Sequence, residues 1–273
     1  MKMYLGEDGA PKMQKEGYAG YRHEYDERGE IVLKMYLGED GAPKMQQNGY
    51  AGIRKEYNKQ GKIIHKVYLD ESEAPKMQSG GYVGIRYEYD EQGNEILRMY
   101  LGEAGTPSML PNGIAGVRYE YNERNKEVKR IYVDENAKPS QDKNGCFGYR
   151  TEYDNQGRVI RKVYFDENEQ IMMSLGSGYA QLRCDYVENR QIWTCLDAEG
   201  GVVNGADGFA YEDFLCNTKG NPVQITYRDV LGAPCSKKDG TFKTVHTYIL
   251  GSILVKTEYY DQNGKLLRSV TNR

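Results

Sequence analysis

The sequence predicts an all-β protein made of tandem 32-residue β-hairpin or meander repeats that form a solenoid or superhelical sheet. Three observations support this prediction. Residues 3–14 recur letter for letter at residues 35–46, short segments alternate apolar and polar side chains, and turn-forming tetrapeptides separate those segments. The chain also contains 25 Tyr and 32 Gly but only 5 Phe and 1 Trp, which suits strands joined by tight turns. Helical periodicity is absent.

Three anchors define the repeat. An apolar-Tyr-apolar triplet, a Tyr-Ala-Gly triplet and an Arg-x-Glu-Tyr motif each return every 32 residues or so. The Arg of the last motif is found at Arg22, Arg54, Arg86, Arg118 and Arg150. We count about eight repeats and a partial ninth in a single array over residues 1–273. Residues 1–166 are regular, and residues 167–273 are degenerate repeats that we expect to act as a C-terminal cap.

Each unit contains two turns with the same chemistry. Residues 26–29 have the pattern of a type I turn closed by a glycine in the left-handed region, which predicts a three-residue hairpin loop with positive φ at Gly29 and Gly61. Asn125 stands at this position in the fourth unit, and Asn tolerates the same conformation. A second turn at residues 38–41 predicts a short third strand over residues 42–46.

The hairpin loop also predicts a register. Counting back from Asp26 opposite Glu30 pairs Tyr25 with Ile31, His23 with Leu33 and Tyr21 with Met35. We expect that apolar face to form the core. The other face would carry a repeating polar set, which in the second unit consists of Tyr50, Gly52, Arg54, Glu56, Lys66 and Tyr68.

This predicted polar face has two interpretations. Its residues can serve only to pack one hairpin against the next, because every unit of an array must fit its neighbour. Alternatively, the flat Tyr rings and their polar neighbours form a row of shallow sites for sugar rings. The candidate binding residues are Tyr18, Tyr36, Tyr50, Tyr68, Tyr82, Tyr100, Arg22, Arg54 and Arg86.

We expect no enzyme activity, no cofactor and no metal. His23, His65 and His246 lie in different units, no catalytic or phosphate-binding motif occurs, and the carboxylates recur with the repeat. The Asp- and Asn-rich turns lack the dense oxygen spacing of a calcium loop. The five Cys all lie after residue 145 without zinc spacing, which favours small buried thiols and leaves a disulfide open. Cys195 stands where the repeat has a Tyr.

Charge and hydropathy limit the partners. The net charge is -3, so nucleic acid is not an expected partner, and no segment is apolar enough for a membrane-spanning helix. The chain starts inside a repeat unit. We therefore expect a part of a longer extracellular or cell-surface protein, or a cytoplasmic protein if the chain is complete.

Short motifs resemble the YD repeats of the RHS family, namely residues 25–29, 89–93 and 153–157 with the downstream Asp70, Asp134 and Asp166. The resemblance implies β-hairpins wound into a spiral sheet, in bacterial surface and toxin proteins where they form shells or stalks. The plan is also similar to hairpin repeats that bind cell walls or choline, although those are Trp-rich and Trp193 is the single Trp here.

Two functions from different classes follow. The first is a non-catalytic bacterial repeat module with an extended surface for cell-wall or surface glycans, or for a protein partner, or a role as a spacer. The alternative is a shell segment of an RHS-like toxin-delivery protein, which encloses rather than binds.

Overall fold

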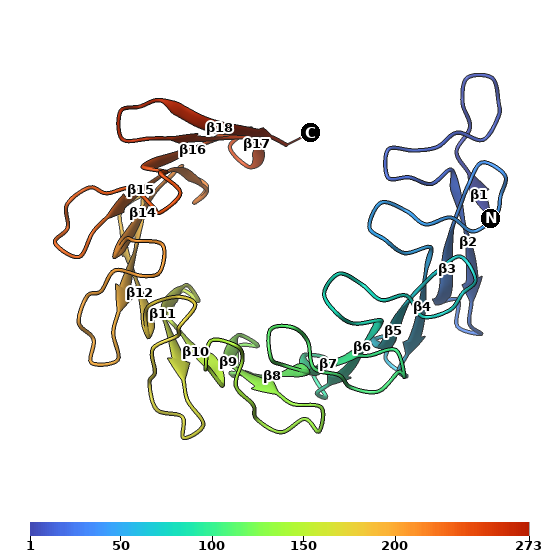
Figure 1. Ribbon diagram of the computed structural model, residues 1–273, viewed down its shortest axis with the longest axis horizontal. Coiled ribbons are helices and arrows are strands. Elements are labelled where there is room, and N and C mark those ends of the chain that lie inside the picture. Colours follow the sequence, from blue (N-terminus) through green and yellow to red (C-terminus); the bar gives the residue numbers. More distant parts are fainter. Residues whose placement is uncertain (273) are drawn as a thin grey trace. The chain divides into compact units, whose positions relative to one another are not determined.

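The computed structural model describes residues 1–272, and all regular structure in that range is β-strand (Figure 1). The strands are β1 (Lys2–Met3), β2 (Gly20–Tyr25), β3 (Ile31–Leu37), β4 (Gly52–Tyr57), β5 (Ile63–Leu69), β6 (Gly84–Tyr89), β7 (Glu95–Leu101), β8 (Gly116–Tyr121), β9 (Glu127–Val133), β10 (Gly148–Tyr153), β11 (Val159–Phe165), β12 (Gln181–Val187), β13 (Arg190–Leu196), β14 (Tyr211–Cys216), β15 (Pro222–Arg228), β16 (Lys243–Ile249), β17 (Ile253–Tyr260) and β18 (Leu266–Thr271). The predicted all-β hairpin fold is confirmed.

The chain divides into two compact units, residues 1–120 with 130–142, and residues 121–129 with 143–273. In the first unit the strands from β1 to β8 pair antiparallel in chain order. In the second unit the strands from β10 to β18 do the same. Figure 1 shows a longer loop between each hairpin and the next. The described residues contain no helix long and apolar enough to cross a membrane.

The predicted turns are present. Asp26 N donates to Glu30 O at 3.0 Å and Gly29 N donates to Asp26 O at 3.0 Å, which closes the three-residue loop. Gly29 and Gly61 have φ of 82° and 75°, and Asn125 takes the same place with φ of 54°. The second turn closes through a bond of 2.8 Å from Gly38 N to Ala42 O. The predicted third strand is reduced to an isolated bridge between Leu37 and Pro43.

The predicted register holds for one pair and then slips. Tyr25 pairs with Ile31 as expected, but Glu24 pairs with Leu33, which leaves Val32 as an extra residue in a bulge. Arg22 therefore lies across from Met35, and Tyr21 lies across from Tyr36. The expected pairs of His23 with Leu33 and of Tyr21 with Met35 are wrong. After the bulge, each residue of β3 pairs with the β2 residue one position later in the sequence than expected.

The slip defines two faces in the first unit. The core face carries Leu33, Met35 and Leu37, and the arginine and glutamate of the Arg-x-Glu-Tyr motif lie on the same side. Met35 and Leu69 are fully buried there and pack with Leu33 and Ala51. The opposite face carries Tyr21, Lys34 and Tyr36 in the first hairpin. We call it the lysine–tyrosine face.

Side chains tie each hairpin to the one before it. Tyr57 Oη donates to Ile31 O at 2.9 Å, and Tyr89 Oη donates to Ile63 O at 2.8 Å. Glu71 Oε1 accepts from Met45 N at 3.1 Å in the loops. Each of these bonds joins residues 26 positions apart, so the sequence repeat is in part a repeat of interstrand ties.

Candidate binding surface

A continuous row of tyrosine rings runs through the first unit. Each ring contacts the next, and the centroids of neighbours lie 4.8 to 6.1 Å apart in tilted or edge-to-face geometry. The members are Tyr18, Tyr36, Tyr50, Tyr68, Tyr82 and Tyr100, and we call them the tyrosine ladder. Rings from the loops, such as Tyr50, alternate with rings from the strands, such as Tyr68.

The ladder rings are partly covered by one another. Tyr36 is only 8% exposed, and the other five are half-buried. Burial raises the pKa of Tyr36, Tyr50, Tyr68 and Tyr82 above the ordinary value of 10.0. The rings are thus neither fully open to solvent nor sealed between repeats. They contribute packing, and part of each ring stays accessible.

Lysines line the strand side of the ladder. Lys34 Nζ lies 4.6 Å from the ring centroid of Tyr36, and Lys66 Nζ lies 4.5 Å from that of Tyr68. Lys66 also donates to Tyr68 Oη at 2.7 Å. Lys55 lies directly across from Lys66 on the lysine–tyrosine face.

These three lysines repel one another. Burial lowers the pKa of Lys55, and the charges of Lys66 and Lys34 lower it further, while Glu30 opposes the effect. No ion pair joins Lys34, Lys55 or Lys66 to a carboxylate within the part of the chain that the structure describes. The lysine–tyrosine face therefore has uncompensated positive charge in a chain whose net charge is negative.

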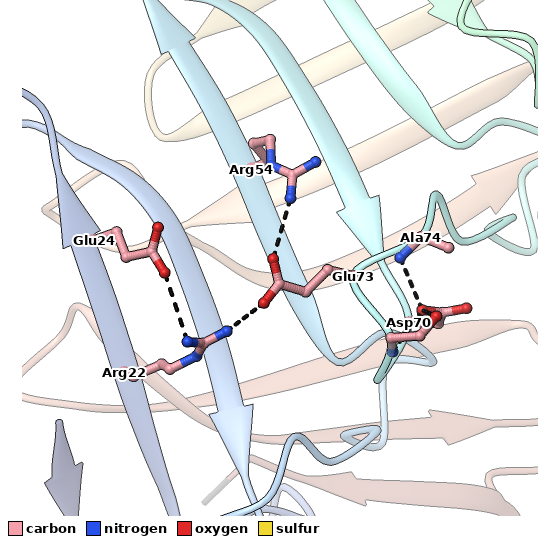
Figure 2. Close-up of polar contacts among 7 residues, drawn as sticks. Arg22, Glu24, Arg54, Asp70, Glu73 and Ala74 are labelled. Carbon is pink, nitrogen blue, oxygen red and sulfur yellow. Dashed lines mark hydrogen bonds and ion pairs between the residues drawn. The ribbon is translucent and has the colours of Figure 1, made fainter.

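The arginines lie on the core face and are engaged. Arg54 Nη2 lies 3.2 Å from Glu73 Oε2, and Arg22 contacts the other oxygen of Glu73 as well as Glu24 (Figure 2). Glu73 has φ of 65°, in the same left-handed region that Gly41 occupies with φ of 77° in the equivalent turn of the preceding repeat. Asp70 Oδ1 accepts from Ala74 N at 3.0 Å and holds this turn. Arg86 has a looser ion pair, 3.8 Å, with Glu88.

The predicted polar face is therefore divided between two surfaces. The ladder tyrosines come together, but Arg22, Arg54 and Arg86 lie on the core face, across the sheet from Tyr36, Tyr68 and Tyr100. Lys34 and Lys66 hold a recurring basic position and lie on the same face as Tyr36 and Tyr68, as the sequence predicts. Lys55 has no Lys or Arg counterpart in the other regular units, and the bulge places it on this face.

The histidines and cysteines form no shared site. The ring of His23 stacks on that of Tyr21, with the centroids 4.7 Å apart. Burial lowers the pKa of His23, and the charge of Lys34 lowers it further. All five cysteines are free thiols, and all but Cys235 are buried. Among the described residues no group of three or more His, Cys, Asp or Glu side chains has metal-binding geometry.

Comparison with known proteins gives likenesses of fold. No protein-family model and no curated protein matches the sequence. Two similar solved structures are toxin proteins. The Photorhabdus luminescens Tc holotoxin pore has 14% identity and a TM-score of 0.42 over 89% of this chain, and TcdB2–TccC3 without its hypervariable C-terminal region has 13% identity and a TM-score of 0.31 over 96%. This chain spans 12% and 14% of their lengths.

A third similar structure is a porin-like protein from Bacteroides uniformis. It has 13% identity and a TM-score of 0.37, with 81% of this chain and 86% of that chain covered. Because all three TM-scores are below 0.5, the resemblance to RHS repeat proteins stays a prediction.

Proposed function

We propose that the chain is a non-catalytic repeat module of a bacterial surface or secreted protein, and that its lysine–tyrosine face binds an extended glycan with acidic groups. One observation supports this function above the others. Lys34, Lys55 and Lys66 lie without carboxylate partners beside a continuous row of half-buried aromatic rings. Sugar rings stack on aromatic side chains, and acidic groups on the glycan would compensate the lysines.

The spacing suits a polymer. Lys34 and Lys66 occupy equivalent places in successive hairpins, on strands β3 and β5, which are separated by the one strand β4. Two strand spacings amount to about 9.5 Å. A ligand whose charges recur at a similar interval would contact several hairpins at once. Each contact would be weak, and affinity would arise from their number.

A lysine variant tests this proposal. The triple variant Lys34→Gln, Lys55→Gln and Lys66→Gln loses no ion pair and relieves the mutual repulsion, but it removes the contacts of Lys34 and Lys66 with the rings of Tyr36 and Tyr68. The ladder rings themselves are retained, so the fold should be kept, and far-ultraviolet circular dichroism checks this. We expect binding to acidic glycans on an array, or to isolated cell walls, to fall at least about tenfold. Binding of the intact chain should also weaken as salt rises.

Controls separate this function from general polyanion binding. A matched triple variant at exposed lysines of the loops, Lys12→Gln, Lys15→Gln and Lys44→Gln, should bind as the intact chain does. Failure of the intact chain to bind any glycan, or equal binding by the face variant, would contradict the proposal. Equal competition by a single-stranded oligonucleotide would point to charge alone.

A second candidate is a wall segment of a toxin-enclosing shell. The observation in its favour is the dense set of ties between successive hairpins, such as Tyr57 to Ile31, which suits a wall as well as a binding surface. Electron microscopy of the product of the whole gene would separate the two. A closed particle with this array in its wall would favour the shell, and an extended particle would favour the binding module.

A further inference from the structure

In the second unit the ring of Tyr179 contacts that of Tyr164, and the ring of Phe209 contacts that of Tyr227. A cavity lies between these two pairs of rings. Its apolar part has a volume of about 340 Å³. The residues that line it are Lys162, Tyr179, Leu182, Trp193, Cys195, Phe209, Glu212 and Phe214. An adjoining, more polar cavity shares Tyr179, Cys195, Phe209 and Glu212, and adds Ser177, Asp207 and Lys237. Together they are lined by the strands from β11 to β14, by the loops before β12 and after β13, and by Lys237.

The gap between the two pairs of rings follows from Cys195. In the first unit the ring of Tyr68 lies between those of Tyr50 and Tyr82, at 4.9 and 6.1 Å. Cys195 is the second-unit equivalent of Tyr68, because both make the same backbone bond. Tyr68 N donates to Val83 O and Cys195 N donates to Ala210 O, both at 2.8 Å. The flanking rings are retained as Tyr179 and Phe209, but the central ring is replaced by a thiol.

A second side chain is missing at the same place. Gln78 N donates to Tyr82 O at 2.9 Å, and the equivalent bond of 2.8 Å runs from Gly205 N to Phe209 O. A Cβ on Gly205 would lie 3.2 Å from Tyr179 Cδ1 and 3.5 Å from Cys195 Sγ, so Gly205 borders the space directly. A ring and a glutamine side chain are therefore both absent from one spot, which leaves a slot of aromatic dimensions.

The slot has one carboxylate aimed at its aromatic wall. Glu212 lies directly across from Trp193 in the β13–β14 pair, where the first unit has Ile85 across from Lys66. It forms no hydrogen bond or ion pair within the described residues. Burial raises the pKa of Glu212, Lys237 opposes that rise and Asp207 adds to it. Glu212 lines both cavities and is not among the buried side chains that lack a partner, so its carboxylate is free to accept a hydrogen bond from a ligand.

The nearby cations are already engaged. Lys162 Nζ lies 3.6 Å from the ring centroid of Tyr149, and Lys237 Nζ lies 3.6 Å from Asp207 Oδ2. The slot therefore offers aromatic surface and a carboxylate acceptor, and it does not favour an anion.

We propose that this slot binds a small planar aromatic group that carries a hydrogen-bond donor, such as a phenol, in the place of the missing tyrosine ring. The ring lies between Tyr179 and Phe209 against Trp193, and the donor faces Glu212. The site is singular in the array, whereas the proposed glycan surface is repeated. It therefore does not depend on the glycan proposal.

Trp193 supplies the measurement, because it is the single tryptophan of the chain and it lines the slot. We expect p-cresol to change its fluorescence in a saturable way. Toluene has the same shape without the hydroxyl, and should bind about fivefold more weakly, the loss of one hydrogen bond. In Glu212→Gln the preference for p-cresol over toluene should shrink.

Variants at Cys195 test the slot itself. Cys195→Tyr restores the ring and should abolish saturable binding, whereas Cys195→Ala leaves the slot open and should retain it. If Cys195→Tyr does not fold, Gly205→Gln fills the space from the other side and should act in the same direction. Cys235→Ser, at a cysteine outside both cavities, is the control and should bind normally. Absence of saturation in the intact chain, or unchanged binding in a folded Cys195→Tyr or Gly205→Gln variant, would overturn the proposal.

Discussion

The glycine that opens β2, β4, β6 and β8 is needed because a neighbouring backbone lies against it. A Cβ on Gly84 would lie 2.6 Å from Lys66 O and 3.3 Å from Val67 Cγ2, and the carbonyl cannot move without disturbing the strand pair. We therefore expect Gly84→Ala to reduce the free energy of unfolding by about 2 kcal/mol, the usual effect of overpacking. Urea denaturation would measure it, and an unchanged midpoint would contradict the assigned contact.

The tyrosine of the Arg-x-Glu-Tyr motif contributes through its hydroxyl. Tyr57 Oη donates to Ile31 O, and Phe at this position would leave that carbonyl without its partner. We expect Tyr57→Phe to cost about 1 kcal/mol. Tyr25 is the matched control, since it holds the same motif position but is 59% exposed, and its hydroxyl contacts His23 Nδ1 at 3.3 Å instead of a backbone carbonyl. Tyr25→Phe should leave the denaturation midpoint within error, and equal effects in the two variants would contradict this explanation.

Single residues also show how far sequence reasoning reaches. The positive φ of Gly29 and of Asn125 followed from turn chemistry that is local to four residues. The half-burial of the tyrosine ladder did not, because it depends on rings from a different loop and strand, such as Tyr50 and Tyr68. A recurring tyrosine is equally consistent with packing and with binding until its neighbours are known.

At the scale of the hairpin, the sequence predicts the turn but not the bulge beyond it. The two strands alternate in a way that allows either of two registers, and the extra residue is an ordinary β-branched one, Val32. Leu33, Met35 and Leu37 share one face in both registers, and the bulge decides that Arg22 and Glu24, instead of Tyr21 and His23, lie beside them. The exchange of faces moved the arginines away from the strand tyrosines and divided the predicted site.

The repeat contains a third turn that local reasoning could have found. Gly49 N donates to Gln46 O at 2.9 Å with φ of 84° at Gly49, and the same glycine recurs as Gly17, Gly81 and Gly113.

The period of the repeat shortens in the degenerate region because a hairpin loop changes there. In β12–β13 the pairing continues to Val187 opposite Arg190, so a tight two-residue turn replaces the three-residue loop and shortens the period.

The hairpin turns make the fold acid-sensitive. The backbone N–H of Glu30 holds the pKa of Asp26 below its ordinary value of 3.8, and that of Arg158 does the same for Asp154. Because these folded-state pKa values are lowered, the stabilisation is complete above the ordinary value and is lost as pH falls through the folded value. Stability should therefore decline in strongly acidic solution.

An asparagine variant isolates this effect. Asn58 already accepts from Gln60 N and Lys62 N at 2.9 and 3.0 Å without titrating. In the double variant Asp26→Asn and Asp154→Asn, the loss of unfolding free energy between about pH 5 and pH 2 should be smaller than in the intact chain. Denaturation curves across that range would show it. An identical pH dependence in both proteins would mean that other carboxylates dominate.

At the scale of the whole array, variants of the tyrosine ladder distinguish a role in packing from a role in glycan binding. Its rings contact one another along the first unit, so removing them tests stability, whereas removing only their hydroxyls tests binding. A row of Ala at Tyr50, Tyr68, Tyr82 and Tyr100 should therefore lower the free energy of unfolding by several kcal/mol, at about 2 kcal/mol for each half-buried ring. Loss of glycan binding in that variant would reflect unfolding.

The informative variant is the same row changed to Phe. The edge-to-face contacts survive this change and the apolar area of each ring is retained, so far-ultraviolet circular dichroism should stay close to that of the intact chain. The lost bond from Lys66 to Tyr68 Oη should lower the free energy of unfolding by about 1 kcal/mol, well short of the effect of the Ala row. If the tyrosine hydroxyls bind the glycan together with Lys34, Lys55 and Lys66, the Phe row should weaken binding in proportion to the number of positions changed, because the contacts act by avidity. A Phe row that binds as the intact chain does would leave the lysines as the only polar contacts of the surface, and the tyrosine ladder as packing alone.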